Sequence, residues 1–273
     1  MCTNYKPVTL QDRLLSHFGV VRPDDEDPLE LIYPGFGAPF IVRPEHRAEL
    51  ARECLVGLFG LLPEWAPNLA YGRNTYNCRT ESMRQLPSFK QTWFSARRCI
   101  IPAEWIYENC HETGDPVRWR IQLSHGGPMG VAGLWGVWKD RNGVDTLSFT
   151  MLTVSGAGHA IYERMHAPGD EKRMPVIVHR EDFDGWLNCA VADADQYLRQ
   201  YPAELLKAEP DPAPWKKLPE PKSWAAEPDM FQDEWRHAAE DPAARMIKAR
   251  RARQKPKGPP PLEEDGPSTG DLF

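Results

Sequence analysis

The sequence predicts an α+β protein built around antiparallel strands. Apolar and polar side chains alternate along residues 117–123, which is the period-two pattern of a half-buried strand. Two further apolar runs, residues 129–138 and 146–154, flank Asn142-Gly143, a strong signal for a hairpin turn. These three strands are expected to form an antiparallel meander. Because the helical segments are few and short, the class is α+β.

The other expected elements are shorter. Thr9 is expected to cap a helix that runs through Phe18 and ends before Gly19, with Leu10 and Leu14 on its apolar face. Short helices are predicted at residues 159–166 and 181–187, and short strands at residues 54–62, 99–102 and 175–179.

Length and composition restrict the protein class. The 273 residues allow one large domain or two small ones, and 26% charged with 10% aromatic residues is typical of a soluble globular protein. No run of 18 apolar residues and no secretory signal is found, so we expect a cytoplasmic, nucleoid-associated protein. The six cysteines form no Cys-x-x-Cys pair, so neither a disulfide framework nor a metal site is expected, and no cofactor is predicted.

The chain is expected to comprise one compact domain, residues 1–230, and a flexible tail, residues 231–273. Residues 245–257 hold seven basic residues and no acidic one, and residues 259–273 are Pro-rich and acidic. The last five residues, Thr269–Phe273, resemble peptides that dock on bacterial replication sliding clamps, with Asp271, Leu272 and Phe273 as the contacts.

Residues 71–100 are locally basic in a chain whose net charge is −6. This segment and its flanks also contain aromatic residues, which are Trp65, Tyr71, Tyr76 and Trp93. Cations beside rings suit a single nucleic-acid strand, with phosphates on the cations and bases near the rings. An ordinary solvated face is the alternative.

Cys2 is the residue with the most distinctive chemistry. Loss of Met1 would leave an α-amine that titrates near ~8 and a thiol near ~8.5 on one residue. Such a 1,2-aminothiol condenses with an aldehyde to an imine, and its sulfur then closes a five-membered thiazolidine.

Three internal clusters also carry polar chemistry. Asn77 and Arg79 could orient an amine and grip a phosphate, or form a polar turn with a local ion pair to Glu81. Glu108 follows an apolar aromatic run that suits a general acid–base, or it is an exposed strand-end carboxylate. His166 precedes a Pro-Gly loop and could carry a proton or cap a helix end.

The order of these motifs resembles the SOS-response-associated peptidase (SRAP) family, whose members process abasic sites. The resemblance rests on Met-Cys, Asn-x-Arg-x-Glu, Arg-Arg-Cys-Ile-Ile-Pro-Ala with a later Tyr-Glu, and His-x-Pro-Gly-x-x-x-Arg-Met-Pro-Val-Ile, over about residues 2–190. Residues 58–65 are also similar to the family's Trp-Gly-Leu-Ile-Pro-x-Trp segment. The family fold has curved antiparallel strands in a barrel-like core.

The resemblance implies a function and its residues. It implies a covalent thiazolidine crosslink between Cys2 and the ring-opened sugar of an abasic site in single-stranded DNA, formed by a monomer that removes its own Met1. The implied catalytic set is Cys2, Asn77, Glu108 and His166. The implied DNA contacts are Arg79, Arg84, Trp65 and Phe59.

Two alternatives and three departures remain. The alternatives are a cysteine peptidase or hydrolase acting on proteins, with Cys2 or another Cys and His166, and a non-catalytic single-strand nucleic-acid binder. Thr3 and Asn4 replace the family's Gly-Arg, and Asn109 stands where many members have Trp, which puts details of DNA contact in doubt.

Overall fold

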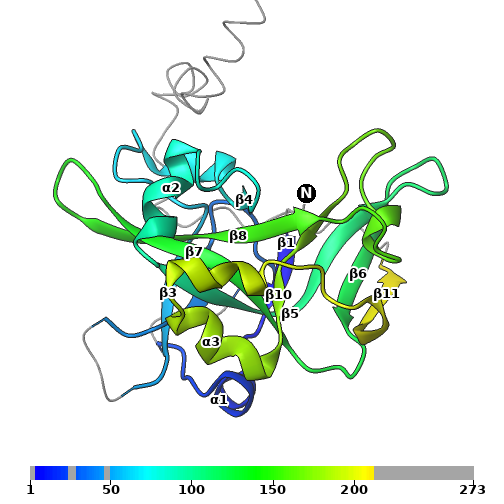
Figure 1. The fold of residues 1–273 in the computed structure, drawn as a ribbon, viewed down its shortest axis with the longest axis horizontal. Coiled ribbons are helices and arrows are strands. Elements are labelled where there is room, and N and C mark those ends of the chain that lie inside the picture. Colours follow the sequence, from blue (N-terminus) through cyan, green and yellow to red (C-terminus); the bar gives the residue numbers. More distant parts are fainter. Residues whose placement is uncertain (1–3, 24–28, 46–49, 212–273) are drawn as a thin grey trace, which may run out of the picture.

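A computed structural model describes residues 4–23, 29–45 and 50–211 of the chain. Five strands close into a barrel, each paired with the next and the last with the first (Figure 1). In ring order they are β7 (Met129–Lys139), β8 (Asp145–Ser155), β3 (Glu53–Phe59), β2 (Gly37–Val42) and β5 (Arg98–Cys110). The expected curved, mostly antiparallel sheet with a barrel-like core is therefore confirmed.

The interior of the barrel is aromatic. The Phe149 ring lies 5.2 Å from Phe40 and 5.4 Å from Phe59, and all three side chains are fully buried. The β3–β8 pairing is parallel and short, and a Cβ at Gly57 would lie 2.7 Å from the Leu147 carbonyl oxygen. A glycine at position 57 therefore permits the close approach that closes the ring.

The long strand β5 decides how the predicted meander is arranged. Its first half pairs with β7, from Arg98↔Leu134 to Ala103↔Met129, and its second half pairs with β6 (Val117–Leu123). The β7–β8 hairpin is confirmed, but the expected β6–β7 pairing is wrong. The turn at residues 124–128 lets the chain continue along one edge of β5 instead of folding back.

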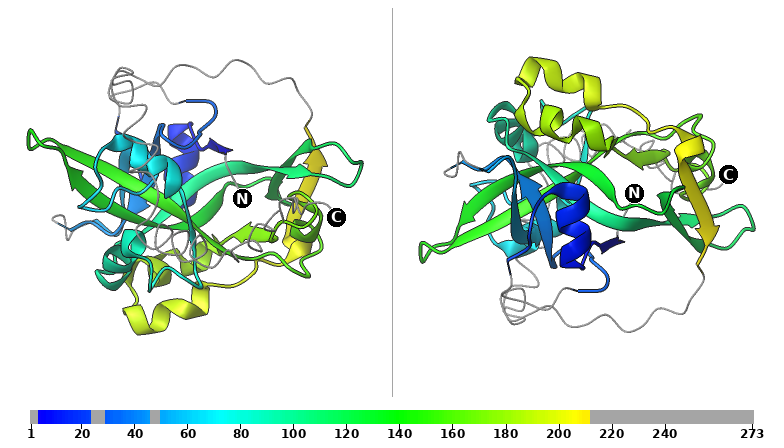
Figure 2. Two further views of the ribbon diagram at one scale, coloured as in Figure 1. Left: turned by 90° about the horizontal axis from the view of Figure 1, so that it is seen from above. Right: turned by 90° about the horizontal axis from the view of Figure 1, so that it is seen from below.

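The second half of β5, β6 and β11 (Leu206–Pro210) form a wing beyond the barrel. β11 pairs with the free edge of β6, antiparallel. Figures 1 and 2 show this wing at one end of the molecule and the β7–β8 hairpin at the other.

Short strands pair with the edges of the barrel strands. β1 (Asn4–Pro7) pairs with β5 on the edge opposite β6. β4 (Asn77–Arg79) and β9 (Arg173–Pro175) pair with the last residues of β8, and β10 (Ile177–Val178) pairs with β7. The predicted strand at 175–179 is thus split in two, and β1, β2, β4 and β11 were not predicted.

Helices are short, as expected. They are α1 (Gln11–Phe18), α2 (Pro87–Phe94), α3 (Phe183–Asn188) and the 3-10 turns η1 (Leu69–Asn74), η2 (Tyr162–Arg164), η3 (Arg180–Asp182), η4 (Val191–Tyr197) and η5 (Ala203–Leu205). α1 ends at Gly19, whose φ of 72° gives the left-handed cap that glycine favours. No side-chain cap from Thr9 forms, and only a single 3-10 turn stands where a helix at 159–166 was expected.

Among the described residues, no helix is long and apolar enough to cross a membrane. The predicted boundary at residue 231, the basic segment and the clamp-like peptide lie outside the described residues.

Candidate active site

Glu108 and His166 form a buried acid–imidazole pair. Nε2 of His166 lies 3.3 Å from Oε2 of Glu108, and the two residues are only 7% and 5% exposed. Glu108 is near the end of β5, whereas His166 follows η2. The structure therefore brings together two residues that the sequence could only nominate separately.

The pair has unused hydrogen-bonding capacity. Within residues 4–23, 29–45 and 50–211, three atoms of the pair make no hydrogen bond. They are Nδ1 and Nε2 of His166 and Oε1 of Glu108. Leaving buried polar atoms without partners costs about 1–3 kcal/mol each. Three such atoms in one buried acid–imidazole pair leave hydrogen-bonding capacity that a reacting group could use.

The backbone holds His166 in an uncommon conformation. Its φ is +67°, the left-handed region that non-glycine residues rarely adopt, at a cost of about 1–3 kcal/mol. Its N–H donates to the Asn109 carbonyl at 2.8 Å, and Met165 bridges to Cys110. The end of β5 thus compensates this strain and aims the imidazole at Glu108.

The described chain begins beside this pair. Asn4 is the cross-strand partner of Tyr107, the residue before Glu108. Because β1 runs antiparallel to β5, the chain from Pro7 back to Asn4 runs toward Glu108. Cys2 itself lies outside the described residues.

Asn77 and Arg79 reach the same side of the barrel through β4. Asn77 pairs with Met151 of β8. Two edge-to-face ring contacts connect β1 to Tyr76, the residue before Asn77. The ring centroids are 5.5 Å apart for Tyr5 and Phe59, and 5.8 Å apart for Phe59 and Tyr76. The predicted polar cluster of Asn77 and Arg79 therefore follows a residue that is linked to β1 through ring contacts.

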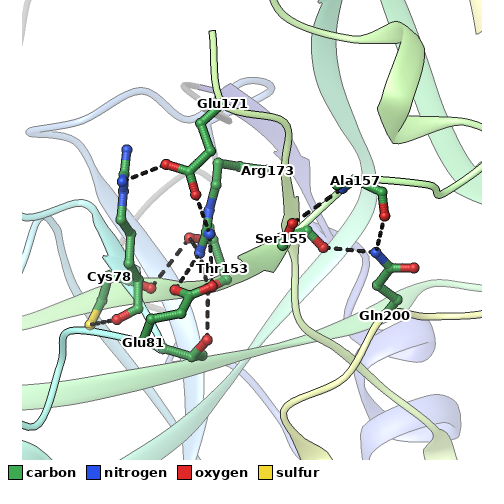
Figure 3. A network of polar contacts seen from close by, with 10 residues as sticks. Cys78, Glu81, Thr153, Ser155, Ala157, Glu171, Arg173 and Gln200 are labelled. Atoms are coloured by element: carbon green, nitrogen blue, oxygen red, sulfur yellow. Dashed lines mark hydrogen bonds and ion pairs between the residues drawn. The ribbon is translucent and has the colours of Figure 1, made fainter.

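Arg79 does not form the local ion pair with Glu81. Its Nη1 lies 2.6 Å from Oε2 of Glu171, and both side chains are about half exposed. Glu81 instead accepts two hydrogen bonds from Arg173, at 2.8 and 2.9 Å, which lower the pKa of its carboxyl. Figure 3 shows Arg173 between Glu81 and Glu171.

Sequence reasoning had assigned no role to Glu171 or Arg173, although Arg173-Met174-Pro175 lay within a motif that it singled out. Nothing local in the sequence pairs these residues with Arg79, because the contact arises where β4 and β9 meet the end of β8.

The expected DNA contacts have different surroundings. Phe59 is fully buried in the barrel, so the expectation that it contacts DNA is wrong: its ring packs against Phe149. Trp65 is 43% exposed and meets Tyr71 edge-on, which leaves ring surface toward solvent. Arg84 pairs with Asp195 and lies 4.9 Å above the Trp93 ring.

A further aromatic–cation pair flanks Glu108 and was not predicted. Trp119 is the cross-strand partner of Glu108 on β6, and the Arg164 guanidinium lies 4.8 Å from its ring centroid. Glu112 holds Arg164 through two hydrogen bonds of 2.7 Å.

The other acid of the 98–108 motif, Glu104, accepts two hydrogen bonds from Arg13, at 2.8 and 2.6 Å, and is structural.

Four of the five described cysteines are poor nucleophiles. Burial raises the pKa of Cys54 to about 12 and raises the pKa of Cys78 and Cys99 well above the ordinary thiol value. The pKa of Cys189 is raised by burial too. A thiolate at neutral pH is therefore not favoured at any of these four positions.

A separate cleft of about 600 Å³ lies between α1, the turn at 124–128 and η3. None of the predicted site residues lines it. In the described part of the chain, no group of three or more His, Cys, Asp or Glu side chains is arranged to hold a metal ion.

The family model for SOS response associated peptidase (SRAP) matches residues 1–211. The chain belongs to the SRAP family. The match includes Cys2, Asn77, Glu108 and His166, and it ends at the last described residue.

Curated relatives and solved structures of other chains agree. The abasic site processing protein YoqW of Bacillus subtilis is 32% identical over 156 residues, which are 55% of this SRAP chain and 65% of YoqW. The abasic site processing protein HMCES of Xenopus tropicalis is 26% identical, over 55% of this chain and 54% of HMCES. The chain thus spans less than two thirds of these relatives.

Among solved structures, a protein from Bordetella bronchiseptica superposes with a TM-score of 0.71 and 32% identity, over 77% of this chain and 99% of that one. A protein from Bacteroides thetaiotaomicron shares the fold at 21% identity, with a TM-score of 0.65, over 77% of this chain and 91% of the other.

Proposed function

We propose that this SRAP chain processes abasic sites in single-stranded DNA by forming a covalent thiazolidine through Cys2. The observation that carries the proposal is the buried Glu108–His166 pair beside β1, with polar atoms that make no hydrogen bond within the described residues. The relatives named above are abasic site processing proteins, which supports the same substrate.

The first step prepares the nucleophile. Hydrolysis of the Met1–Cys2 peptide bond adds water across it and releases methionine, leaving the α-amine and thiol of Cys2. We assign this cleavage to the same site.

The amine then attacks C1′ of the ring-opened aldehyde form of the abasic sugar. The C–N bond forms, a proton moves from nitrogen to oxygen, and loss of water gives the imine. Glu108 and His166 are the groups to move these protons, since proton transfer by a positioned side chain accelerates such steps by about 10²–10⁴-fold. Asn77 would accept a hydrogen bond from the amine and aim it at C1′.

Ring closure completes the adduct. The Cys2 sulfur adds to C1′, the C=N π pair becomes the nitrogen lone pair, and the thiol proton passes to nitrogen. The overall change is aldehyde plus aminothiol to thiazolidine plus water. Consuming the imine removes the species that leads to β-elimination, so the DNA strand is shielded from breakage.

DNA contacts would come from exposed side chains. Arg79 is half exposed and suited to a phosphate, and Trp65 offers a ring for base stacking. Arg84 is a weaker candidate because Asp195 already holds it.

One gel tests the proposal. The full chain is incubated with single-stranded DNA that carries one abasic site, and the mixture is denatured with heat. A shifted band is expected for the wild type and not for Cys2→Ala or for protein with a blocked N-terminus. A band that persists in Cys2→Ala would reject the mechanism.

The two alternatives give other results in the same assay. A peptidase of other proteins would cleave peptides and give no DNA adduct, and the raised pKa of the buried thiols disfavours Cys54, Cys78 and Cys99 as its nucleophile. A plain binder would shift DNA only under native conditions, with strong salt dependence that survives Cys2→Ala.

A further inference from the structure

We propose that Glu171 is a positioning residue for DNA binding, which transmits the fixed geometry of the buried Arg173 to the guanidinium of Arg79. This inference rests on the proposed function, since it assigns Arg79 to a DNA phosphate. It adds two residues, Glu171 and Arg173, to which neither the sequence motifs nor the comparisons give a role.

We call the contacts from Arg173 through Glu171 to Arg79 the relay, and Arg173 is its fixed end. Its side chain is 2% exposed, and its Nη2 donates to the Thr153 carbonyl at 2.6 Å and to the Thr153 hydroxyl at 3.2 Å. Its guanidinium also donates twice to Glu81. Because β9 pairs with β8 at Thr153↔Pro175, backbone and side chain both lock Arg173 to the barrel (Figure 3).

Glu171 bridges two guanidinium groups with its two oxygens. Oε1 accepts from Arg173 Nη1 at 2.8 Å, and Oε2 lies 2.6 Å from Arg79 Nη1. A carboxylate can accept from both sides at once because it has two acceptor oxygens and no donor. An amide in its place would present an NH₂ group to one of the two cations.

Among the residues that the structure describes, the Arg79 guanidinium is held at one corner only. Its contact with Glu171 uses Nη1, and 46% of the side chain is exposed. A guanidinium has five N–H donors in a planar fork, so one ion pair leaves the other edge for a phosphate. Anchoring one corner reduces the rotamer freedom that a long side chain loses on binding DNA.

For the loss of the Glu171 charge, this arrangement predicts a change in DNA affinity opposite in sign to the change that simple electrostatics predicts. Glu171 is an anion beside a surface expected to bind a polyanion, so removing its charge should strengthen DNA binding if charge were its only effect. If Glu171 positions Arg79, removing the carboxylate should weaken binding.

The test measures affinity for undamaged single-stranded DNA at several salt concentrations, using the full chain. Glu171→Gln is expected to bind about three- to tenfold more weakly at low salt, and its log Kd–log salt slope should fall by about 0.7, the value for one phosphate contact on a single strand. Arg79→Ala should show the same slope loss, and Arg79→Ala/Glu171→Gln should bind like Arg79→Ala alone.

Asp145→Asn is the matched control, since Asp145 forms an exposed ion pair with Lys139 at the β7–β8 hairpin. It removes the same charge and should not weaken binding. Glu171→Ala is a second variant, and thermal unfolding of each variant checks that the fold is intact. Unchanged or tighter binding by folded Glu171→Gln and Glu171→Ala, or a further loss in the double variant, would overturn the relay.

The abasic-site gel separates this proposal from the proposed function. In crosslinking, the half-saturating DNA concentration of Glu171→Gln should rise more than the maximal rate falls. A wild type that binds DNA but never crosslinks would refute the crosslinking chemistry and leave the relay standing on binding data. If Arg79→Ala binds with the wild-type salt slope while crosslinking persists, the relay is refuted and the chemistry survives.

Discussion

Oε2 of Glu108 lies 3.3 Å from Nε2 of His166, and both residues are buried. The strain in the His166 backbone, and the hydrogen-bonding capacity that both side chains leave unused among the described residues, have no structural benefit of their own. Strain and unsatisfied polar atoms of this kind concentrate at functional sites.

Replacing the acid should slow the covalent step. Glu108→Gln keeps the shape of the side chain but removes its proton-accepting carboxylate, so the single-turnover rate of crosslinking should fall about 10²–10⁴-fold. The rate is measured by quenching the reaction at timed intervals and counting the denaturation-resistant band. Glu104→Gln, which alters an acid bound by Arg13, is the control, and equal rates for both variants would contradict the assignment.

Acid should destabilise the fold through His17. Burial, followed by the charges of Arg180, His125 and Arg13, lowers the pKa of His17 from 6.5 to about 4. Between these pH values the unfolded chain binds the proton and the folded chain does not, so this contribution to stability rises with pH over that window and is fully present above about 6.5. His17→Gln should therefore flatten the pH dependence of the free energy of unfolding in urea between about 4 and 6.5.

His111→Gln is the control for that experiment, because His111 is not among the groups that act on His17. A wild-type stability that is flat between about pH 4 and pH 6.5, or an equal flattening by both variants, would contradict the role of His17.

Two Arg–Glu pairs that differ in the burial of the arginine should differ in their contribution to stability. Glu81 and Glu112 each accept two hydrogen bonds from one arginine, but the Arg173 side chain is 2% exposed and the Arg164 side chain 39% exposed. Glu81→Gln removes one of the two carboxylates that bind the buried Arg173 guanidinium and leaves Glu171 as the other, and it should cost about 1–3 kcal/mol of the free energy of unfolding. Glu112→Gln should cost measurably less, because solvent screens an exposed ion pair.

The Glu81 contribution should also depend on pH. Because Arg173 lowers the pKa of Glu81 in the fold, its stabilisation is present above the ordinary carboxyl pKa and is lost as pH falls through the lowered value. Equal losses for Glu81→Gln and Glu112→Gln at neutral pH in urea unfolding would be evidence against this difference.

Two aromatic residues of one motif should separate stability from DNA binding. Phe59→Ala leaves a cavity beside Phe149 and should destabilise the fold by about 3–5 kcal/mol. Trp65→Ala removes an exposed ring and should change stability little but weaken single-stranded DNA binding by about 1–3 kcal/mol. Thermal unfolding and fluorescence anisotropy measure the two effects, and a Trp65→Ala variant with wild-type affinity would remove this residue from the DNA surface.

The sequence contained enough to predict the parts that depend on neighbours along the chain. The Asn142-Gly143 hairpin, the end of α1 at Gly19 and the strand at 117–123 follow from local turn chemistry and side-chain alternation, and all three are present. The residue types of the site, above all an acid in an apolar strand and a histidine before a Pro-Gly loop, could also be selected from the sequence.

Only the tertiary structure decided which of these residues meet. In the folded chain Glu104 binds Arg13, whereas Glu108 lies beside His166. Arg79 pairs with Glu171 instead of Glu81. Phe59 is buried in the core. It also placed β6 and β7 end to end along β5. The physical reason is that contacts in a closed sheet are set by register and by strand order between distant segments, and no local pattern of side chains specifies either.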